Sequence, residues 1–323
     1  MTKAAKIWLI AGIALIVIGC IIFGGMMMAL KFNFKKLSTS KYETNEYVIA
    51  DSYTDISIDT DTADIVFVPY KGSETRVVCY EDIRSKHTVK AENGTLIITN
   101  VNNMKWYDSI GINFDTPKIT VNIPAGGYGD IKVDATTGDM ELPTGLNFNN
   151  IQLTVTTGDI TNRASATGAI KIKTTTGDIC VENVSAGSLD LSATTGKGKV
   201  TGSSVVGDID VKISTGKMNI TDVTCTNLTA KGTTGDLSLK NVILKGKFNI
   251  KRSTGDVRLY GCDAAELYIN TTTGDVKGTL LSGKTFTANT TTGDIDTPDN
   301  TDGGTCNINT TTGDIKIEIE PSA

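Results

Sequence analysis

The chain has 323 residues, of which 39% are hydrophobic and 21% charged, with 33 glycines and only six prolines. This composition can bury a core and does not fit a disordered chain. The first 41 residues carry six lysines and no acid, which leaves 25 bases against 36 acids, a net charge of −11, in the remainder. Such a surface repels nucleic acid, so nucleic acid is not expected as a partner. The sequence contains no P-loop, dinucleotide fingerprint or zinc-type cysteine spacing, and we expect no cofactor.

An apolar segment follows a short tail of residues 1–6. Residues 7–30 read IWLIAGIALIVIGCIIFGGMMMAL, 24 residues without a charge. At about 1.5 Å per residue they span roughly 36 Å, enough to cross a hydrocarbon layer of ~30 Å. A cleaved signal peptide usually has a shorter apolar run and a small-x-small exit, and neither occurs here. We therefore expect a transmembrane helix, with the membrane as its partner.

Two questions about this segment remain open: whether it is cleaved as a lipoprotein signal, and on which side of the membrane the following domain lies. Val-Ile-Gly-Cys, ending at Cys20, fits a bacterial lipoprotein cleavage box, although a lipoprotein normally turns polar after the cysteine and this chain stays apolar. Lysines flank the segment on both sides, so the positive-inside rule does not decide the orientation. A short tail before a large folded domain favours a signal anchor in a bacterial cell membrane, with the domain outside the cell.

After a linker, residues 31–45, the strand patterns of residues 46–130 are separated by uneven turns. Examples are ADIVFVP at 63–69, NGTLIIT at 93–99 and ITVNIPAG at 119–126. We expect this irregular β part to start and cap the regular array that follows. The single histidine, His87, lies here and is expected in a surface loop rather than in a catalytic site.

In residues 131–323 ten Thr-Gly pairs, usually followed by Asp, stand at spacings of 19 or 20 residues. A period held this tightly predicts a solenoid of stacked repeats. The glycines expected at the structural turn are Gly138, Gly158, Gly177, Gly196, Gly216, Gly235, Gly255, Gly274, Gly293 and Gly313.

Mostly aliphatic residues stand seven and five positions before each glycine and two after it, with polar residues between them. This period-two alternation predicts strands on both sides of the corner. Around the second turn of the repeat, Val184, Val223, Val242 and Leu281 are expected to face inward. The predicted fold class is an all-β parallel β-solenoid, or β-helix, of 19–20-residue rungs with an N-terminal transmembrane helix.

The corner explains the repeated glycine. Strand alternation must break between the two strands, and glycine supplies the positive φ or the close backbone approach that the bend needs. Successive repeats are expected to lie directly on one another, about 4.8 Å apart, so that equivalent side chains form files. The last strand, KIEIEP at 316–321, is expected to blunt the exposed edge through its charges and proline.

These patterns resemble a bacterial adhesin-like family of β-strand repeats, the domain of unknown function numbered 4097. ADIVFVP, NGTLIIT, ITVNIPAG and the later TTGDI copies carry the resemblance, which covers nearly everything after residue 45. The N-terminal apolar anchor is similar to that of membrane-bound members. The resemblance implies adhesion or a role in envelope-stress systems, and it transfers no residue's chemistry.

Aspartate follows the glycine in eight copies, and Lys197 and Lys217 take its place in the other two. Capping of the turn explains these aspartates best. A calcium ladder is the alternative, because a column of carboxylates repels itself, but the nonapeptide of calcium-binding solenoids is absent. The aspartates are Asp139, Asp159, Asp178, Asp236, Asp256, Asp275, Asp294 and Asp314.

The five cysteines outside the apolar segment are an odd number, and Cys225, Cys262 and Cys306 are expected to point inward as small hydrophobic residues. The predicted function is a membrane-anchored extracellular module that binds without catalysis, adhesin-like or associated with envelope stress, with a cell-surface glycan or envelope protein as partner. One alternative is a cytoplasm-facing scaffold that polymerises end to end. The other is a polysaccharide-active β-helix enzyme, which needs acids converging in a groove walled by long loops, and rungs of nearly constant length leave no room for such loops.

Overall fold

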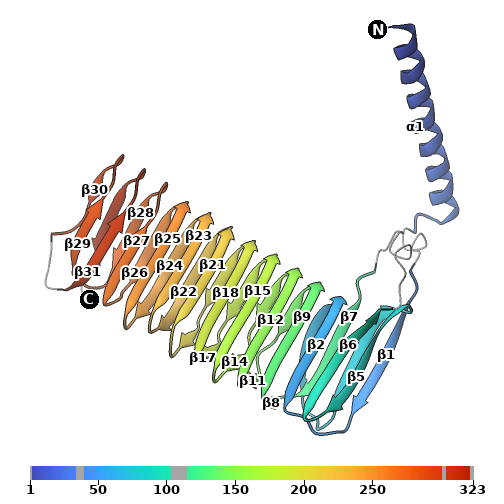
Figure 1. The fold of residues 1–323 in the computed structure, drawn as a ribbon, viewed down its shortest axis with the longest axis horizontal. Helices are drawn as coiled ribbons and strands as arrows, with labels where there is room; N and C mark the ends of the chain where they lie inside the picture. Colours follow the sequence, from blue (N-terminus) through green and yellow to red (C-terminus); the bar gives the residue numbers. More distant parts are fainter. Residues whose placement is uncertain (1, 34–39, 103–114, 300–302, 321–323) are drawn as a thin grey trace.

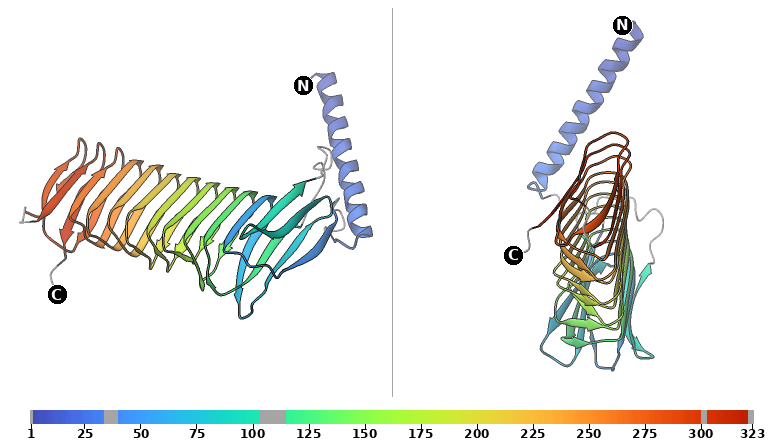
Figure 2. Two further views of the ribbon diagram at one scale, coloured as in Figure 1. Left: turned by 60° about the horizontal axis from the view of Figure 1, so that its bottom comes forward. Right: turned by 90° about the vertical axis from the view of Figure 1, so that its left-hand side faces the viewer.

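The computed structural model describes residues 2–33, 40–102, 115–299 and 303–320 (Figure 1). One helix is followed by an irregular β region and then by a long regular array of stacked strands. Figure 2 shows the rungs of this array behind one another along a rod. The predicted all-β parallel solenoid with rungs of about 20 residues is confirmed.

Helix α1 comprises Lys3–Ala29. It begins before the apolar segment because Thr2 caps it, and the Thr2 side chain accepts a hydrogen bond from the Ala5 amide at 3.4 Å. Its apolar side chains are largely uncovered, with Trp8 78% and Leu15 70% exposed. In the described chain α1 is the one helix that is long and apolar enough to cross a membrane.

The irregular region covers the N-terminal end of the regular array. Strand β1 pairs antiparallel with β4, which pairs antiparallel with β7, while β5 pairs antiparallel with β6. Strands β2 and β3 form a rung of their own, since Ile56 pairs with Ile131 and Ile65 with Met140 in the regular array. The strands are β1 Tyr42–Ile49, β2 Asp55–Thr62, β3 Asp64–Tyr70, β4 Thr75–Asp82, β5 Ser85–Glu92, β6 Thr95–Asn102, β7 Lys118–Pro124 and β8 Gly126–Gly127.

One long sheet of the solenoid contains the strands that precede each corner. They are parallel and in register, so that Ile131, Ile151 and Ile170 form one file. Strands β2, β6 and β5 extend this sheet at its N-terminal end. Its regular strands are β9 Asp130–Thr137, β12 Asn150–Thr157, β15 Ala169–Thr176, β18 Ser188–Thr195, β21 Ile209–Thr215, β23 Leu228–Thr234, β25 Lys247–Thr254, β27 Glu266–Asn270, β29 Lys284–Asn289 and β31 Gly304–Asn309.

The opposite sheet contains the strands that follow each corner, and a narrow third face closes the early rungs. The opposite sheet consists of β10 Met140–Leu142, β13 Ile160–Asn162, β16 Ile179–Glu182, β19 Gly198–Thr201, β22 Met218–Cys225, β24 Leu237–Leu244, β26 Val257–Cys262, β28 Val276–Leu280, β30 Ile295–Asp296 and β32 Ile315–Ile319, together with β3, β7, β4 and β1. The third face carries β8 and the short strands β11 Leu146–Phe148, β14 Ser165–Ala166, β17 Ser185–Ala186 and β20 Ser204–Val205.

A single hydrophobic core runs between the sheets. Val184, Val223 and Val242 are buried in it as expected. The expectation for Leu281 is wrong, because its side chain is 45% exposed. The register between β26 and β28 shifts after Leu259, so that Leu280 pairs with Cys262 and takes the buried position instead.

At the corners, neighbouring rungs approach more closely than a side chain would permit. All ten corner glycines have φ between +121° and +153°. A Cβ atom added to any of them would lie 1.8–2.2 Å from a carbonyl oxygen of the adjacent rung. The same corners are linked by backbone hydrogen bonds such as that from the Gly158 amide to the Thr176 carbonyl, 2.9 Å. Both the dihedral angle and the spacing therefore require glycine.

We expect Gly196→Ala to lower the free energy of unfolding by more than about 2 kcal/mol, because the new Cβ would lie 1.9 Å from the Gly177 carbonyl oxygen at a φ of +151°. Gly126→Ala is the matched control, since nothing lies within 4 Å of its added Cβ. Urea denaturation of both variants checks this. Equal losses in the two variants would show that the corner spacing is not what demands glycine.

The last two rungs do not follow chain order. Strand β31 lies between β27 and β29, and β32 lies between β28 and β30. The final segment, 304–319, is therefore inserted beneath residues 284–296, which form the outermost rung. The expectation that successive repeats always lie directly on one another is wrong at this end.

Sequence explains which of the two rungs is covered. Both carry the same corner, NTTTGDI, so either could stack on the corner of β27 and β28. The inserted rung has four apolar residues at its inward positions, Cys306, Ile308, Ile315 and Ile317, whereas the outer rung has three, Phe286, Ala288 and Ile295, with Thr297 at the fourth. In the outer rung the second strand, β30, ends at Asp296, two residues before Pro298, which cannot donate to a ladder. Burying the more apolar and longer rung leaves the shorter one at the end.

The order of the last rungs also changes which strand forms the exposed edge at this end, because β30 lies outside β32. Strand β32 pairs with β28 along its length, but β30 covers it only at Ile315 and Lys316. Lys316 is therefore not at the edge, whereas Glu318 lies beyond the part of β32 that β30 pairs. Pro321 lies outside the described residues. The outermost strands are β29 and β30.

A cysteine pair can test the order of the last rungs. Asn270 pairs with Asn309, which pairs in turn with Asn289. Neighbouring rungs lie about 4.8 Å apart and alternate rungs about 9.6 Å, whereas a disulfide needs roughly 4.4–6.8 Å between Cα atoms. We expect Asn270→Cys/Asn309→Cys to cross-link on mild oxidation and Asn270→Cys/Asn289→Cys not to, as read by non-reducing peptide mapping. The reverse result would restore chain order.

Candidate functional site

The predicted aspartates form a file along the corner edge of the rod. The carboxylate of one rung accepts a hydrogen bond from the backbone amide at the same position of the next rung. Asp139 accepts from the Asp159 amide at 2.8 Å, and Asp159 accepts from the Asp178 amide at 2.7 Å. The same contact recurs toward the C-terminal end, at Asp236, Asp256, Asp275 and Asp314, where the last accepts from Asp294. Each of these carboxylates thus satisfies an amide that the corner leaves unpaired.

The file extends one rung further than the repeat indicates. Asp64, in the rung of β2 and β3, accepts from the Asp139 amide at 3.0 Å. Its corner has Ala63 where later rungs have glycine, so the Thr-Gly pattern could not identify it. The alternating apolar residues of ADIVFVP were the available signal.

Basic side chains reduce the repulsion within the file. Lys217 Nζ lies 3.3 Å from Asp236, and Lys277 Nζ lies 2.6 Å from Asp275. The hydrogen bond from Lys277, together with the Asp314 amide, holds the pKa of Asp275 below its usual range. These contacts place amides and ammonium groups around the carboxylates, which is an arrangement suited to stabilising the corner.

Substitution of Asp159 separates capping from calcium binding. We expect Asp159→Ala to lower the free energy of unfolding by about 1 kcal/mol, because the Asp178 amide loses its acceptor. Asp159→Asn keeps an acceptor oxygen and removes a like charge, so its stability should equal or exceed that of the parent chain. Thermal unfolding with and without millimolar calcium checks both. A calcium-dependent rise in Tm that Asp159→Asn abolishes would favour the calcium ladder.

Two shallow hollows lie on the outer faces of the rod. One, of about 480 Å³, crosses the narrow third face and is lined by small side chains from several rungs, among them Asn147, Ser165, Ala166, Ser185 and Ala186. The other, of about 310 Å³, lies over β12, β15 and β18 and is lined by the polar groups of Gln152, Thr154, Lys171, Lys173, Asp190 and Ser192. The first hollow repeats similar small groups from rung to rung, whereas equivalent positions in the second carry different polar groups, such as Gln152, Lys171 and Asp190.

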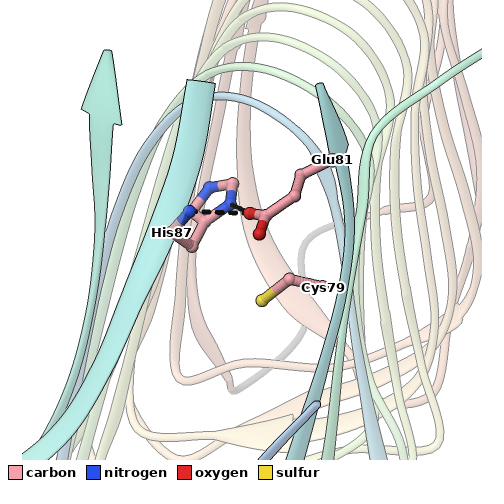
Figure 3. A group of neighbouring side chains, drawn as sticks. All are labelled: Cys79, Glu81 and His87. Atoms are coloured by element: carbon pink, nitrogen blue, oxygen red, sulfur yellow. Dashed lines mark hydrogen bonds and ion pairs between the residues drawn. The ribbon is translucent and has the colours of Figure 1, made fainter. Parts of the chain in front are cut away.

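A third cluster is buried in the N-terminal cap. Cys79 and Glu81 lie on β4, and His87 lies on β5, in the facing sheet (Figure 3). Cys79 and Glu81 are fully buried and His87 is 3% exposed. One oxygen of the Glu81 carboxylate contacts both His87 Nδ1, at 2.7 Å, and the His87 amide, at 2.6 Å. The expectation that His87 lies in a surface loop is therefore wrong.

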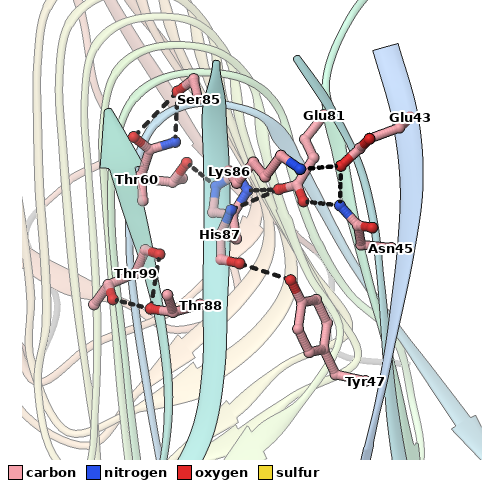
Figure 4. A network of polar contacts seen from close by, with 11 residues as sticks. Glu43, Asn45, Tyr47, Thr60, Glu81, Ser85, Lys86, His87, Thr88 and Thr99 are labelled. Carbon is pink, nitrogen blue, oxygen red and sulfur yellow. Dashed lines mark hydrogen bonds and ion pairs between the residues drawn. The ribbon is translucent and has the colours of Figure 1, made fainter. Parts of the chain in front are cut away.

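A hydrogen-bond network surrounds this cluster (Figure 4). Asn45 donates to the second oxygen of Glu81 at 2.7 Å, and His87 Nε2 lies 2.8 Å from Thr60 Oγ1. Tyr47 donates to the His87 carbonyl at 2.8 Å. Both ring nitrogens of His87 and both carboxylate oxygens of Glu81 therefore have hydrogen-bond partners, which fix the orientation of these two side chains.

The sequence pattern did not predict that Cys79, Glu81 and His87 lie close together. Cys79 and Glu81 alternate with Val78 and Tyr80 on one strand, but only the fold shows that β5 faces this strand. The TRVVCYED pattern, which puts a cysteine and a glutamate on the same face as a buried valine, was the one available hint.

The cysteines of the described chain form no disulfide with one another. Burial raises the pKa of Cys79, Cys225 and Cys306 to about 12, and the neighbouring Glu81 carboxylate contributes to the shift at Cys79. Cys225, Cys262 and Cys306 point inward, as expected. Protonated buried thiols of this kind are inert unless a cation or metal stabilises the thiolate.

The fold and these sites define a parallel β-solenoid with an irregular cap and an apolar N-terminal helix. The chain belongs to the Toastrack family, the domain of unknown function 4097, whose family profile matches residues 53–221 and 199–323. The family resemblance indicated by the sequence is thus confirmed.

Several solved bacterial structures are similar to this chain. A "putative adhesin" of Parabacteroides distasonis is 10% identical with a TM-score of 0.43, covering 86% of this chain and 98% of its own. A "putative lipid binding protein" of the same organism is 14% identical with a TM-score of 0.46, covering 84% and 98%. A "putative adhesin" of Bacteroides fragilis is 15% identical with a TM-score of 0.29, covering 87% and 99%. No curated protein matches the sequence.

Proposed function

We propose that the protein is a membrane-tethered module that presents its β-solenoid outside a bacterial cell and binds a cell-surface glycan or envelope protein without catalysis. The observation that carries this proposal is the uncovered apolar helix α1 directly ahead of a long rod. Its side chains, such as Trp8 and Leu15, are exposed to an extent that water disfavours and a hydrocarbon layer would accommodate.

The outer faces supply suitable binding groups. The hollow over β12, β15 and β18 presents amide, hydroxyl, ammonium and carboxylate groups within a small area. Such groups can donate to and accept from sugar hydroxyls or a peptide backbone. Neighbouring rungs place these different groups side by side, since Gln152 pairs with Lys171 and Lys171 with Asp190. The net charge of −11 beyond residue 41 favours a neutral or cationic partner over an anionic one.

The second candidate function is a scaffold that associates end to end. It is favoured by the position of β29, which is the last strand of its sheet at this end of the described array and pairs there with β31. Concentration-dependent sedimentation of the full-length chain in detergent would reveal such polymers.

Protease treatment of intact cells tests display. We expect the β domain to be degraded from outside while a cytoplasmic marker survives, and the residual helix to remain with the membrane fraction. A domain that survives shaving but is cut after lysis would place it inside the cell and favour the scaffold.

Binding is tested separately with insoluble cell-wall material and the full-length chain in detergent. We expect co-sedimentation that Lys171→Ala/Lys173→Ala weakens several-fold, because both lysines line the polar hollow. Lys240→Ala/Lys245→Ala is the matched control, since it removes two exposed lysines from elsewhere on the rod. Equal binding by both double variants would exclude the hollow as the contact surface.

A further inference from the structure

We propose that Cys79, Glu81 and His87 form a binding site for one transition-metal ion, of which Zn²⁺ is the best fit, inside the N-terminal cap. Among the residues that the structure describes, these three form the one group whose potential ligand atoms all lie within 4.8 Å of one another. The site is independent of the outer faces that the proposed function uses.

The ligands come from both sheets. Cys79 and Glu81 project from the same face of β4, two residues apart, while His87 projects from β5 in the facing sheet (Figure 3). Only a short turn at residues 83–84 separates the two strands. An ion held here would therefore join the two sheets at the end where the regular stack begins.

The chemistry of the three groups suits zinc. Thiolate sulfur, imidazole nitrogen and carboxylate oxygen are its usual protein ligands, at about 2.3, 2.0 and 2.1 Å. Those bond lengths imply separations of roughly 3.3–3.6 Å between ligand atoms in a tetrahedral site. The present contact of 2.7 Å between Glu81 and His87 Nδ1 would open by about half an ångström, within reach of small side-chain rotations. Three protein ligands leave a fourth position for water.

Charge balance favours the ion. A carboxylate buried in the core is costly unless a positive charge compensates it. A divalent ion with one carboxylate and one thiolate gives a neutral buried group. It also gives the Cys79 thiol a partner, whereas no hydrogen bond involves this thiol among the described residues.

The surrounding contacts are those that orient metal ligands. When His87 donates from Nε2 to Thr60 Oγ1, the Nδ1 lone pair is directed toward Glu81 and Cys79 and is free for a metal. Asn45 holds the other oxygen of Glu81. The opposite tautomer gives a metal-free pair, in which Nδ1 donates to Glu81 and Thr60 donates to Nε2. In that case Cys79 takes no part, so the thiol distinguishes the two arrangements.

The test uses the full-length chain purified in detergent. We expect elemental analysis to find about one zinc ion per chain, and the chelator-treated chain to bind one Co²⁺ with a thiolate-to-cobalt charge-transfer band in the near ultraviolet. Cys79→Ser should remove this band and weaken Co²⁺ binding at least tenfold, and His87→Gln should weaken it similarly. Cys225→Ser, which alters a buried thiol elsewhere in the core, should leave both unchanged.

Two results would overturn the proposal. One is a parent chain, folded by circular dichroism, that binds neither Zn²⁺ nor Co²⁺. The other is a charge-transfer band that persists in Cys79→Ser or disappears in Cys225→Ser. Because the parent chain alone can give the first result, the test does not depend on the variants folding.

Discussion

The structure depends on how closely the backbones of successive rungs approach at the corner. Each corner glycine faces a carbonyl oxygen of its neighbour at a distance where no Cβ fits, and nine of the ten corner amides donate to the next rung. Straight files of side chains follow from this contact, because a corner of fixed shape repeated at fixed spacing brings equivalent residues into register. The aspartate capping of the corner amides and the continuous aliphatic core both require that register.

Much of this could be predicted from the sequence. Ten corners at a constant interval, with aliphatic residues at fixed offsets, determine the strands, the inward positions and the parallel stacking. These features are local or strictly periodic, so one repeat predicts the others. Leu281 shows the limit of this approach: a single register shift after Leu259 exchanged the roles of Leu281 and Leu280, and periodicity alone does not reveal such shifts.

Two further features escaped prediction because they depend on the packing between strands and not on the repeat pattern. The repeats around Gly293 and Gly313 share one corner sequence, so pattern alone cannot decide which stacks on Gly274, and the apolar content of their flanking strands decides it. His87 is a similar case. Its neighbours in sequence are polar, and only the packing of β5 against β4 places it beside Glu81 and Cys79.

The inserted last rung has a consequence for synthesis. As the chain emerges from the ribosome, rungs up to Leu280 can be added one at a time, each on a finished predecessor. The segment 284–296 cannot take its final place in the same way, because the rung beneath it is made from residues 304–319, which are synthesised later. The outermost rung must therefore wait until residues 304–319 have been made and packed.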